Sequence, residues 1–216
     1  MIDTHMLNSS ACKGRVNLLR FLAVAILALD LLASPAATAA DSAVQVVENL
    51  HAELLLVMRQ AAELGYRGRY QQLAPVVTSS YDLPFIAKTV VGRYWRKFTP
   101  EERSTFVESF TKLSVATYAD RFDGYSGERF STVSDEALQK GRHLVRTLLV
   151  KSSGEQVELD YILHQSSNQW RIINVIAQGV SDLSLKRADY TSFLKNKSFD
   201  ELLSKLEHKI GEYERK

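Results

Sequence analysis

The strongest candidate for catalysis is one predicted strand in which Asp160 and His164 flank Tyr161. A carboxylate and an imidazole are groups that general acid–base catalysis often uses. Residues four apart in a strand share one face but lie about 13 Å from each other, which is too far for direct proton transfer. We therefore interpret the pair as polar residues on a solvent-facing side of a sheet. The alternative is an enzyme that uses Asp160 or His164 on a small hydrophobic substrate.

Metal, nucleotide and nucleophile chemistry have no recognisable motif in this sequence. Four histidines follow residue 41: His51, His143, His164 and His208. None is three or four residues from another, so no helical pair of metal ligands is present. The sequence also lacks the G-x-S-x-G elbow, the phosphate-binding glycine loop and the dinucleotide fingerprint. We expect a protein that is not an enzyme and that binds no metal and no cofactor.

Residues 93–98 (RYWRKF) form a basic and aromatic strip with three cations, Arg93, Arg96 and Lys97. The strip could meet lipid head groups or an acidic partner. It could also simply end a helix, where cations interact favourably with the helix dipole. The whole chain has 27 Lys and Arg against 25 Asp and Glu, a net charge of +2. Nucleic-acid binders usually show a larger basic excess, so we expect no nucleic-acid partner.

The residues from 41 to 125 are predicted to be mainly helical, because apolar side chains recur there at helical spacing. The clearest helix start is Thr99-Pro100-Glu101-Glu102, which combines an N-cap threonine, a proline at the first helical position and a capping-box glutamate. Gly65 and Gly92 are expected to end two helices, and Pro75 to interrupt another. We expect helices over residues 41–64, 66–80, 83–91 and 100–122.

After residue 126 the hydrophobic pattern changes to the alternation of strands, separated by turn sequences such as Ser152-Ser153-Gly154. Four strands are expected over residues 128–133, 141–150, 156–164 and 169–177. From residue 181 the chain is expected to close with helices at 182–194 and 198–213, and Ser198 with Glu201 forms a capping box. Helices first, a meander next and helices last predict an α+β fold with helices on one face of a curved sheet.

The first forty residues have the pattern of a secretory signal. A positive segment precedes an apolar run at residues 21–32, and small residues then suit cleavage after Ala39 or Ala40. The run is too short for a transmembrane helix, which needs about 20 apolar residues. We predict a cleaved signal peptide at residues 1–40 and a single domain at residues 41–216 that works in the periplasm. Cys12, the only cysteine of the sequence, would leave with the signal.

Two stretches of the chain resemble the MlaC, or toluene-tolerance, family of periplasmic lipid-binding proteins. The first is AKTVVGRYWRKFTPEE at residues 87–102, followed by Phe106 and Phe110, and the second is WRIINVIAQGVS at residues 170–181. They occur in the family's order and with similar spacing. A third stretch, YADRFDGYSGERF at residues 118–130, is similar to the hopanoid-associated HpnM branch.

This resemblance implies a curved antiparallel sheet packed by helices, like that of nuclear transport factors, with an added helical part and an enclosed apolar cavity. It implies a carrier, expected to be a monomer, that shuttles a phospholipid or a hopanoid between inner- and outer-membrane transport complexes. It implies no catalytic residues, in agreement with the motif search. A scaffold that binds no ligand and only adapts an envelope transporter is the remaining alternative.

The apolar faces of the two family-like stretches, and of the segments beside the first, are expected to form the wall of this cavity. The expected lipid-binding residues are Ile86, Val90, Tyr94, Phe110 and Leu113 on helices, with Ile172 and Ile176 on one strand. Arg93, Arg96 and Lys97 are expected near the cavity mouth. There they would meet anionic head groups or acidic surfaces of partner complexes, since a local charge patch can steer association.

Overall fold

The computed structural model describes residues 42–215, and the predicted signal peptide lies outside these residues. The described α-helices are α2 (Ala43–Arg59), α3 (Ala61–Ser80), α4 (Leu83–Val91), α5 (Pro100–Arg121), α6 (Asp182–Phe193) and α7 (Phe199–Glu214). Short 3₁₀ turns occupy Gly92–Arg96 (η1) and Gln139–Gly141 (η2). The strands are β1 (Arg129–Leu138), β2 (Arg142–Val150), β3 (Gln156–Ser166), β4 (Gln169–Ala177) and β5 (Val180–Ser181). None of the helices described here has the length and hydrophobicity that crossing a membrane requires.

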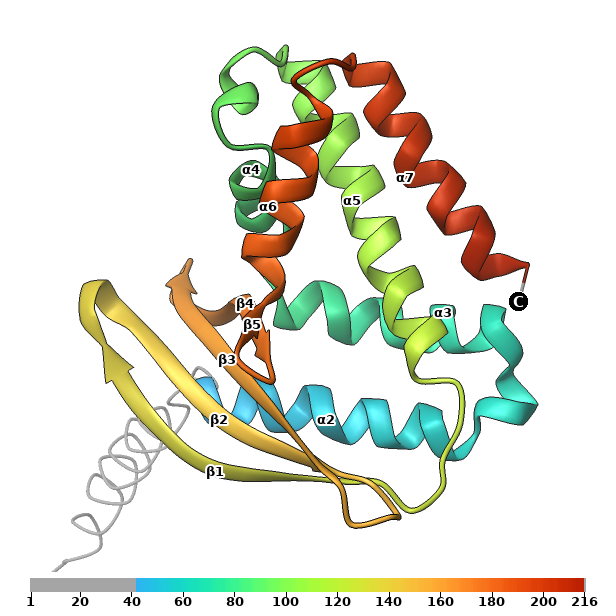
Figure 1. Ribbon diagram of the computed structural model, residues 1–216. Coiled ribbons are helices and arrows are strands. Elements are labelled where there is room, and N and C mark those ends of the chain that lie inside the picture. The colour runs from blue at the N-terminus through green and yellow to red at the C-terminus, as the bar shows by residue number, and fades with distance from the viewer. Residues whose placement is uncertain (1–41, 216) are drawn as a thin grey trace, which may run out of the picture. The chain divides into compact units, whose positions relative to one another are not determined.

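The strands form one meander in the order β1-β2-β3-β4-β5, in which every neighbouring pair is antiparallel. The sheet is curved, and α2 lies along its concave side (Figure 1). α5 packs against α7 farther from the strands, and α4 packs against α6. This arrangement confirms the predicted α+β fold with a curved antiparallel sheet packed by helices.

Two helices start at the reciprocal capping boxes that the sequence predicts. Thr99 Oγ1 accepts a hydrogen bond from the backbone N–H of Glu102, and the Glu102 carboxylate accepts one from the N–H of Thr99. Ser198 and Glu201 make the same pair of bonds at the start of α7. Each box satisfies two backbone donors that a helix start leaves unpaired, and both predicted starts are confirmed.

The first two helices differ from the prediction at their junction. α2 ends at Arg59, earlier than expected, and α3 begins directly after Gln60. The backbone of Gly65 is not helical, with φ 57° and ψ −176°, so it separates a short helical turn at residues 61–64 from the helix that continues to Ser80, as the sequence predicts. Pro75 also lies inside α3, which continues to Ser80. The sequence pattern therefore located the break at Gly65, but it missed the end of α2 at Arg59 and wrongly expected Pro75 to interrupt the following helix.

A β-bulge interrupts the regular alternation of β4. Ile172 opposes Leu163 on β3, but the next paired residue of β4 is Asn174, which opposes Ile162. Ile173 is therefore the extra residue of the bulge. Because side chains alternate along a strand, one inserted residue reverses the faces that the following side chains occupy.

Because of this bulge, the prediction that Ile172 and Ile176 share one face of the sheet is wrong. Opposed residues in an antiparallel pair point to the same side of the sheet. Ile176 opposes Asp160, whereas its neighbour Val175 opposes the buried Tyr161. Val175 therefore takes the helix-facing side that the sequence pattern assigned to Ile176.

The hydrophobic core fills the space between the helices and the sheet. Its largest fully buried side chains include Phe106 and Phe110 of α5 and Leu163 of β3. Tyr190 of α6 packs edge-on against both phenylalanines, with ring centroids 6.2 and 6.4 Å away. These contacts hold α5 in place, and with it the row of α5 side chains that faces the strands.

Candidate functional site

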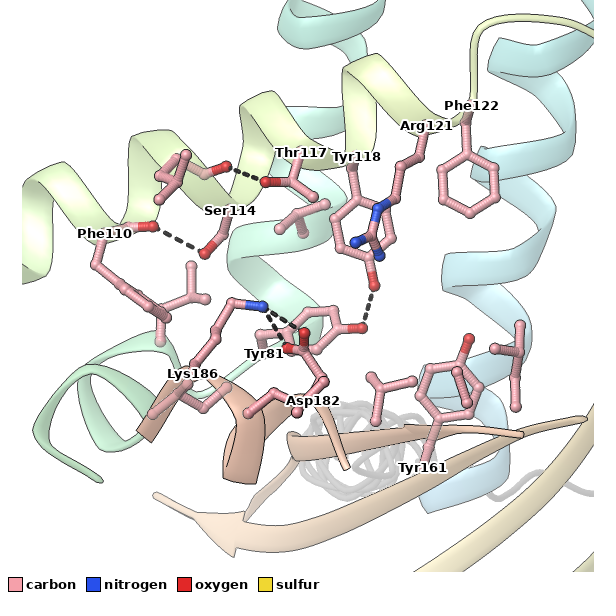
Figure 2. Close-up of a pocket in the computed structure, with 18 of the residues that line it drawn as sticks. Tyr81, Phe110, Ser114, Thr117, Tyr118, Arg121, Phe122, Tyr161, Asp182 and Lys186 are labelled. Carbon is pink, nitrogen blue, oxygen red and sulfur yellow. Dashed lines mark hydrogen bonds and ion pairs between the residues drawn. The ribbon is translucent and has the colours of Figure 1, made fainter. Parts of the chain in front are cut away.

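An apolar cavity of about 300 Å³ lies between α5 and the sheet. Parts of α3, α4 and α6 and strands β3, β4 and β5 complete its wall (Figure 2). Much of this wall is aliphatic and includes Val77, Leu83, Ile86, Leu159 and Val175. The volume is at the low end of the range of about 300–1,000 Å³ that is typical of small-molecule pockets.

Helix α5 supplies one continuous side of the cavity. Its lining residues follow the i, i+3, i+4, i+7 spacing of one helix face: Phe110, Leu113, Ser114, Thr117, Tyr118 and Arg121. The hydroxyls of Ser114 and Thr117 donate to the carbonyls of Phe110 and Leu113, each at 2.8 Å. Since these hydroxyls are bonded within their own helix, both residues present mainly carbon to the cavity.

Three tyrosine side chains bring hydroxyls into this mainly apolar wall. The hydroxyls of Tyr81 and Tyr118 hydrogen-bond each other (Figure 2). The Tyr161 hydroxyl lies 2.9 Å from Nε2 of His51. Burial raises the pKa of Tyr118 to about 12 and lowers the pKa of His51 to about 4. These groups are therefore uncharged at neutral pH.

Tyr81 is held at the point where the chain leaves α3 for α4. Tyr81 forms an isolated parallel bridge with Ile172 of β4, and the N–H of Asp82 donates to the Ile172 carbonyl at 3.0 Å. Asp82 also caps α4 by accepting from the N–H of Phe85. His164 Nε2 lies 2.8 Å from the other Asp82 carboxylate oxygen. The backbone around Tyr81 is thus joined to the sheet.

The mouth of the cavity combines charge with exposed apolar side chains. Val180 and Leu185 line it and are 51% and 59% exposed. Lys186 pairs with Asp182 one turn earlier on α6, and Arg121 comes from α5 (Figure 2). Such a mouth suits a molecule that has a hydrocarbon part for the cavity and a polar or charged end for the rim.

Residues 48–208 match the family model described as MlaC protein. The match covers more than half of the chain. The chain belongs to the MlaC family. The family predicted from the stretches at residues 87–102 and 170–181 is therefore confirmed.

Two curated relatives share part of their length with this MlaC-family chain. The intermembrane phospholipid transport system binding protein MlaC of Haemophilus influenzae is 22% identical over 135 residues, which are 61% of this chain and 63% of that protein. The toluene tolerance protein ttg2D of Pseudomonas putida is 25% identical over 129 residues, which are 59% of this chain and 58% of that protein. The chain thus spans about three fifths of the length of these relatives.

A solved structure shows the same fold. It is the phospholipid-binding protein from Ralstonia solanacearum in complex with a phospholipid, with a TM-score of 0.70 and 18% identity. The match covers 80% of this chain and 99% of that chain. At this identity the likeness shows the fold alone. None of these three proteins is named for hopanoids, so the finer assignment to the HpnM branch stays a prediction.

The predicted site residues of this MlaC-family chain fall into two groups. Those that line the cavity are Ile86, Phe110 and Leu113. Those that do not line it are Val90, Tyr94, Ile172 and Ile176. Val90 and Ile172 are fully buried in the core, and β4 lines the cavity with Val175 and Ala177 instead. Contact of the three lining residues with a lipid stays a prediction.

The basic and aromatic strip lies around η1. Arg93 and Lys97 lie over the ring of the buried Tyr94, each 5.2 Å from its centroid. Neither of these cations, nor Arg96, lines the cavity. Their cationic groups remain available to an acidic or anionic surface, and that contact stays a prediction.

The candidate catalytic residues have separate partners. A carboxylate oxygen of Asp160 lies 3.8 Å from Nε of Arg146, and burial is the main cause that raises the pKa of Asp160. His164 bonds Asp82, the N-cap of α4. Neither Asp160 nor His164 lines the cavity. Within residues 42–215, no three His, Cys, Asp or Glu side chains gather as a metal site would require.

The polar part of the site was missed by the sequence analysis. Tyr118 and Arg121 share the α5 face of Phe110, so helical spacing could have shown them. Tyr81 and Asp182 lie at the end of α3 and the start of α6, and they join the site only through tertiary packing. No local pattern in the sequence marks that meeting.

Proposed function

We propose that this protein carries a membrane lipid through the periplasm, as a monomer, between inner- and outer-membrane transport complexes. The observation that carries the proposal is the apolar cavity, with exposed Val180 and Leu185 beside charged Arg121 and Lys186 at its mouth. The cavity would hold hydrocarbon while the mouth keeps the polar end of the lipid near water. Phospholipid transport and phospholipid binding, named for its relatives, agree with this function.

The free energy of lipid transfer explains why such a carrier is needed. Each methylene moved from hydrocarbon to water costs about 0.8 kcal/mol, so two sixteen-carbon tails represent on the order of 20 kcal/mol. A lipid will therefore not cross water unaided at a useful rate. A protein cavity that resembles the membrane interior makes the exchange nearly thermoneutral. The direction of transport must then come from the partner complexes.

The cavity volume adds a requirement to this proposal. About 300 Å³ is at the low end for a pocket that holds even one small molecule. A lipid with two tails would have to widen the space between α5 and the segment formed by β4, β5 and α6. The exposed side chains of Val180 and Leu185 lie on this second segment, at the place where the walls would separate.

Two lipid classes are retained within this function. The relatives' names support a phospholipid. The likeness of residues 118–130 to the hopanoid-associated branch supports a hopanoid, and the first residues of that stretch, Tyr118, Arg121 and Phe122, line the cavity. A competition between a phospholipid and a hopanoid, both offered in vesicles, decides between them by the lipid recovered with the protein.

Transfer of a fluorescent phospholipid or a labelled hopanoid between two vesicle populations tests the carrier function. We expect the purified protein to raise the transfer rate in proportion to its concentration, and to do so with unaltered lipid. Chemical change of the lipid would favour an enzyme. A rate equal to that of vesicles alone, for both lipid classes, would contradict the proposal and favour the adaptor.

A further inference from the structure

The side chain of Asn174, on β4, is bonded to the start of α6. Its Oδ1 atom accepts hydrogen bonds from the hydroxyl of Ser181 and from the backbone N–H of Leu183, each at 3.1 Å. Ser181 is the N-cap of α6 and accepts a hydrogen bond from the N–H of Ser184. A helix start leaves its first N–H groups without an intrahelical partner, so Asn174 supplies an acceptor that α6 itself lacks.

This contact lies on the face of the sheet away from the cavity. Ser181 opposes Ile176, which shares its face with Asn174 because the two are two residues apart on β4. Val175, between them, points to the other face and lines the cavity. The bulge at Ile173 therefore places Asn174 beside α6 in the same way that it places Val175 in the wall. Neither Asn174 nor Ser181 lines the cavity, so any effect of this contact on a lipid is indirect.

The contact restrains one side of the cavity mouth. We call residues 180–186, which comprise β5 and the start of α6, the gate. The gate supplies four residues of the cavity wall: Val180, Asp182, Leu185 and Lys186. The ion pair of Lys186 with Asp182 lies within the gate, so an outward movement of the gate leaves that pair intact. Such a movement widens the cavity at its mouth, which a lipid with two tails requires.

The chain before the gate is fixed to the sheet. β4 pairs with β3 along its length, and the N–H of Gln178 donates to the Glu158 carbonyl of β3 at 3.0 Å. Gly179 follows with a φ of 76°, a conformation that favours glycine. Apart from its chain neighbours, none of the residues at 42–215 comes within 4 Å of the position that a Cβ would take there. The backbone can therefore turn at Gly179, beyond which only the two residues of β5 pair with β4.

The chain after the gate is anchored in the core. Tyr190 is 4% exposed and packs edge-on against two phenylalanines of α5. Asp189 accepts from Nζ of Lys205 on α7 through both carboxylate oxygens, each at 2.8 Å. The gate thus lies between two anchored parts of the chain. Within it, Leu183 is half-buried against the core, and the Asn174 contact joins the gate's backbone and N-cap to β4.

We propose that Asn174 is a positioning residue that holds the gate closed, and that a lipid enters and leaves the cavity when the gate swings away from α5. The inference rests on the proposed carrier function and adds the part of the wall that moves and the residue that restrains it. Because Asn174 lies on the face of β4 away from the cavity, its bonds stabilise the closed gate equally with and without lipid. Weakening these bonds should therefore speed both uptake and release while leaving the affinity for lipid unchanged.

Asn174→Ala removes the acceptor of both hydrogen bonds. We expect uptake and release of a fluorescent phosphatidylglycerol, measured separately with vesicles, both to become about tenfold faster, which is within the usual effect of two hydrogen bonds. The dissociation constant should stay that of the parent. Asn174→Asp keeps an acceptor oxygen in the same place and should restore the parent rates. Ser198→Ala, which removes the N-cap of α7 outside the cavity wall, is the matched control and should also exchange lipid at the parent rates.

A disulfide tests the gate without altering Asn174. Ile176 and Ser181 are opposed in the ladder of β4 and β5, and opposed Cα atoms lie about 4.5–5.5 Å apart, within the range that a disulfide spans. Residues 42–215 contain no cysteine, so Ile176→Cys with Ser181→Cys makes a single pair. The oxidised form, loaded with lipid beforehand, should release it about tenfold more slowly than the same protein after reduction. Equal release by the two forms overturns the inference.

The outcomes separate this inference from the carrier function. If the parent neither binds nor transfers lipid, the carrier function fails and the gate fails with it. If the parent transfers lipid but Asn174→Ala exchanges it at the parent rates, only the gate is overturned. Weaker binding by Asn174→Ala without faster uptake assigns Asn174 a merely structural role, and it overturns the inference as well.

Discussion

The Nε2 atom of His51 lies 2.9 Å from the hydroxyl oxygen of Tyr161, which joins α2 to β3 at the wall of the cavity. His51 is 4% exposed, and its ring stacks on Phe130 of β1 with centroids 3.9 Å apart. Burial lowers its pKa from 6.5 to about 4. The imidazole is therefore neutral in the folded protein, and it connects a helix with two strands of the sheet.

This buried imidazole predicts a loss of stability in acid. As the pH falls from 6.5 to about 4, the unfolded chain gains a proton at His51 while the folded protein does not. This loss of stability is absent above pH 6.5, grows as the pH falls below 6.5, and amounts to about 3 kcal/mol at pH 4. His51→Phe removes the titrating group and keeps a ring against Phe130. Urea unfolding should show the parent losing about 3 kcal/mol more than this variant over that range. Equal losses would contradict the assignment.

A bulky side chain placed inside the cavity should exclude the lipid. Thr117 lines the cavity and bonds the carbonyl of Leu113 in its own helix. Thr117→Trp is expected to reduce the lipid that co-purifies severalfold, because the indole occupies the space that the tails need. Thr111 makes the same kind of bond on α5 but lies outside the wall, so Thr111→Trp is the control. If Thr117→Trp retains the lipid load of the parent, the lipid does not bind in this cavity.

The exposed apolar side chains at the mouth should affect transfer more than storage. Val180→Ser together with Leu185→Ser removes hydrocarbon that we expect to insert among the lipids of the donor or acceptor membrane. Burial of such side chains contributes about 1.5–3 kcal/mol each, so slower transfer by at least severalfold is expected, with the lipid load retained. Val133→Ser, at a position 60% exposed in β1 and outside the cavity, should transfer lipid at the parent rate. Identical rates in all three proteins would argue against the role of the mouth.

The basic strip predicts a dependence on salt. The triple variant Arg93→Gln, Arg96→Gln and Lys97→Gln should deliver lipid to partner complexes or anionic vesicles more slowly, and its rate should vary less with salt. Screening explains this, since the Debye length falls from about 10 Å at 0.1 M salt to about 3 Å at 1 M. A control variant neutralises three exposed cations of the sheet region instead: Arg129, Lys140 and Arg142. The docking role is rejected if both variants show the salt slope of the parent.

Local signals explain why most helix boundaries could be predicted. Thr99 and Ser198 are capping-box residues, and each box is complete within four consecutive residues. β1 was predicted too short, to Val133, because its second half is polar and exposed on both faces. Pairing with β2 extends the strand to Leu138, and that pairing is not visible in the alternation of β1 itself.

The cavity wall could be predicted only in part, because it depends on strand pairing and tertiary contacts that no local sequence pattern contains. Ile173 forms a bulge because β3 and β4 pair out of step, and this single residue moves Val175 to the helix-facing side in place of Ile176. The polar pair of Tyr81 and Tyr118 forms between residues 37 positions apart. The apolar face of α5 was predictable from helical spacing, while the partners that turn it into a cavity come from tertiary packing.

The central claim is that the cavity carries a lipid, and native mass spectrometry of the protein purified from the cell envelope tests it most directly. We predict a complex with one lipid per polypeptide, whose extra mass disappears on denaturation and appears as an unaltered lipid in the extract. Thr117→Trp, prepared in parallel, should show mainly the mass of the polypeptide alone. The bare polypeptide mass for the parent, both as purified and after incubation with phospholipid and hopanoid vesicles, would contradict the account.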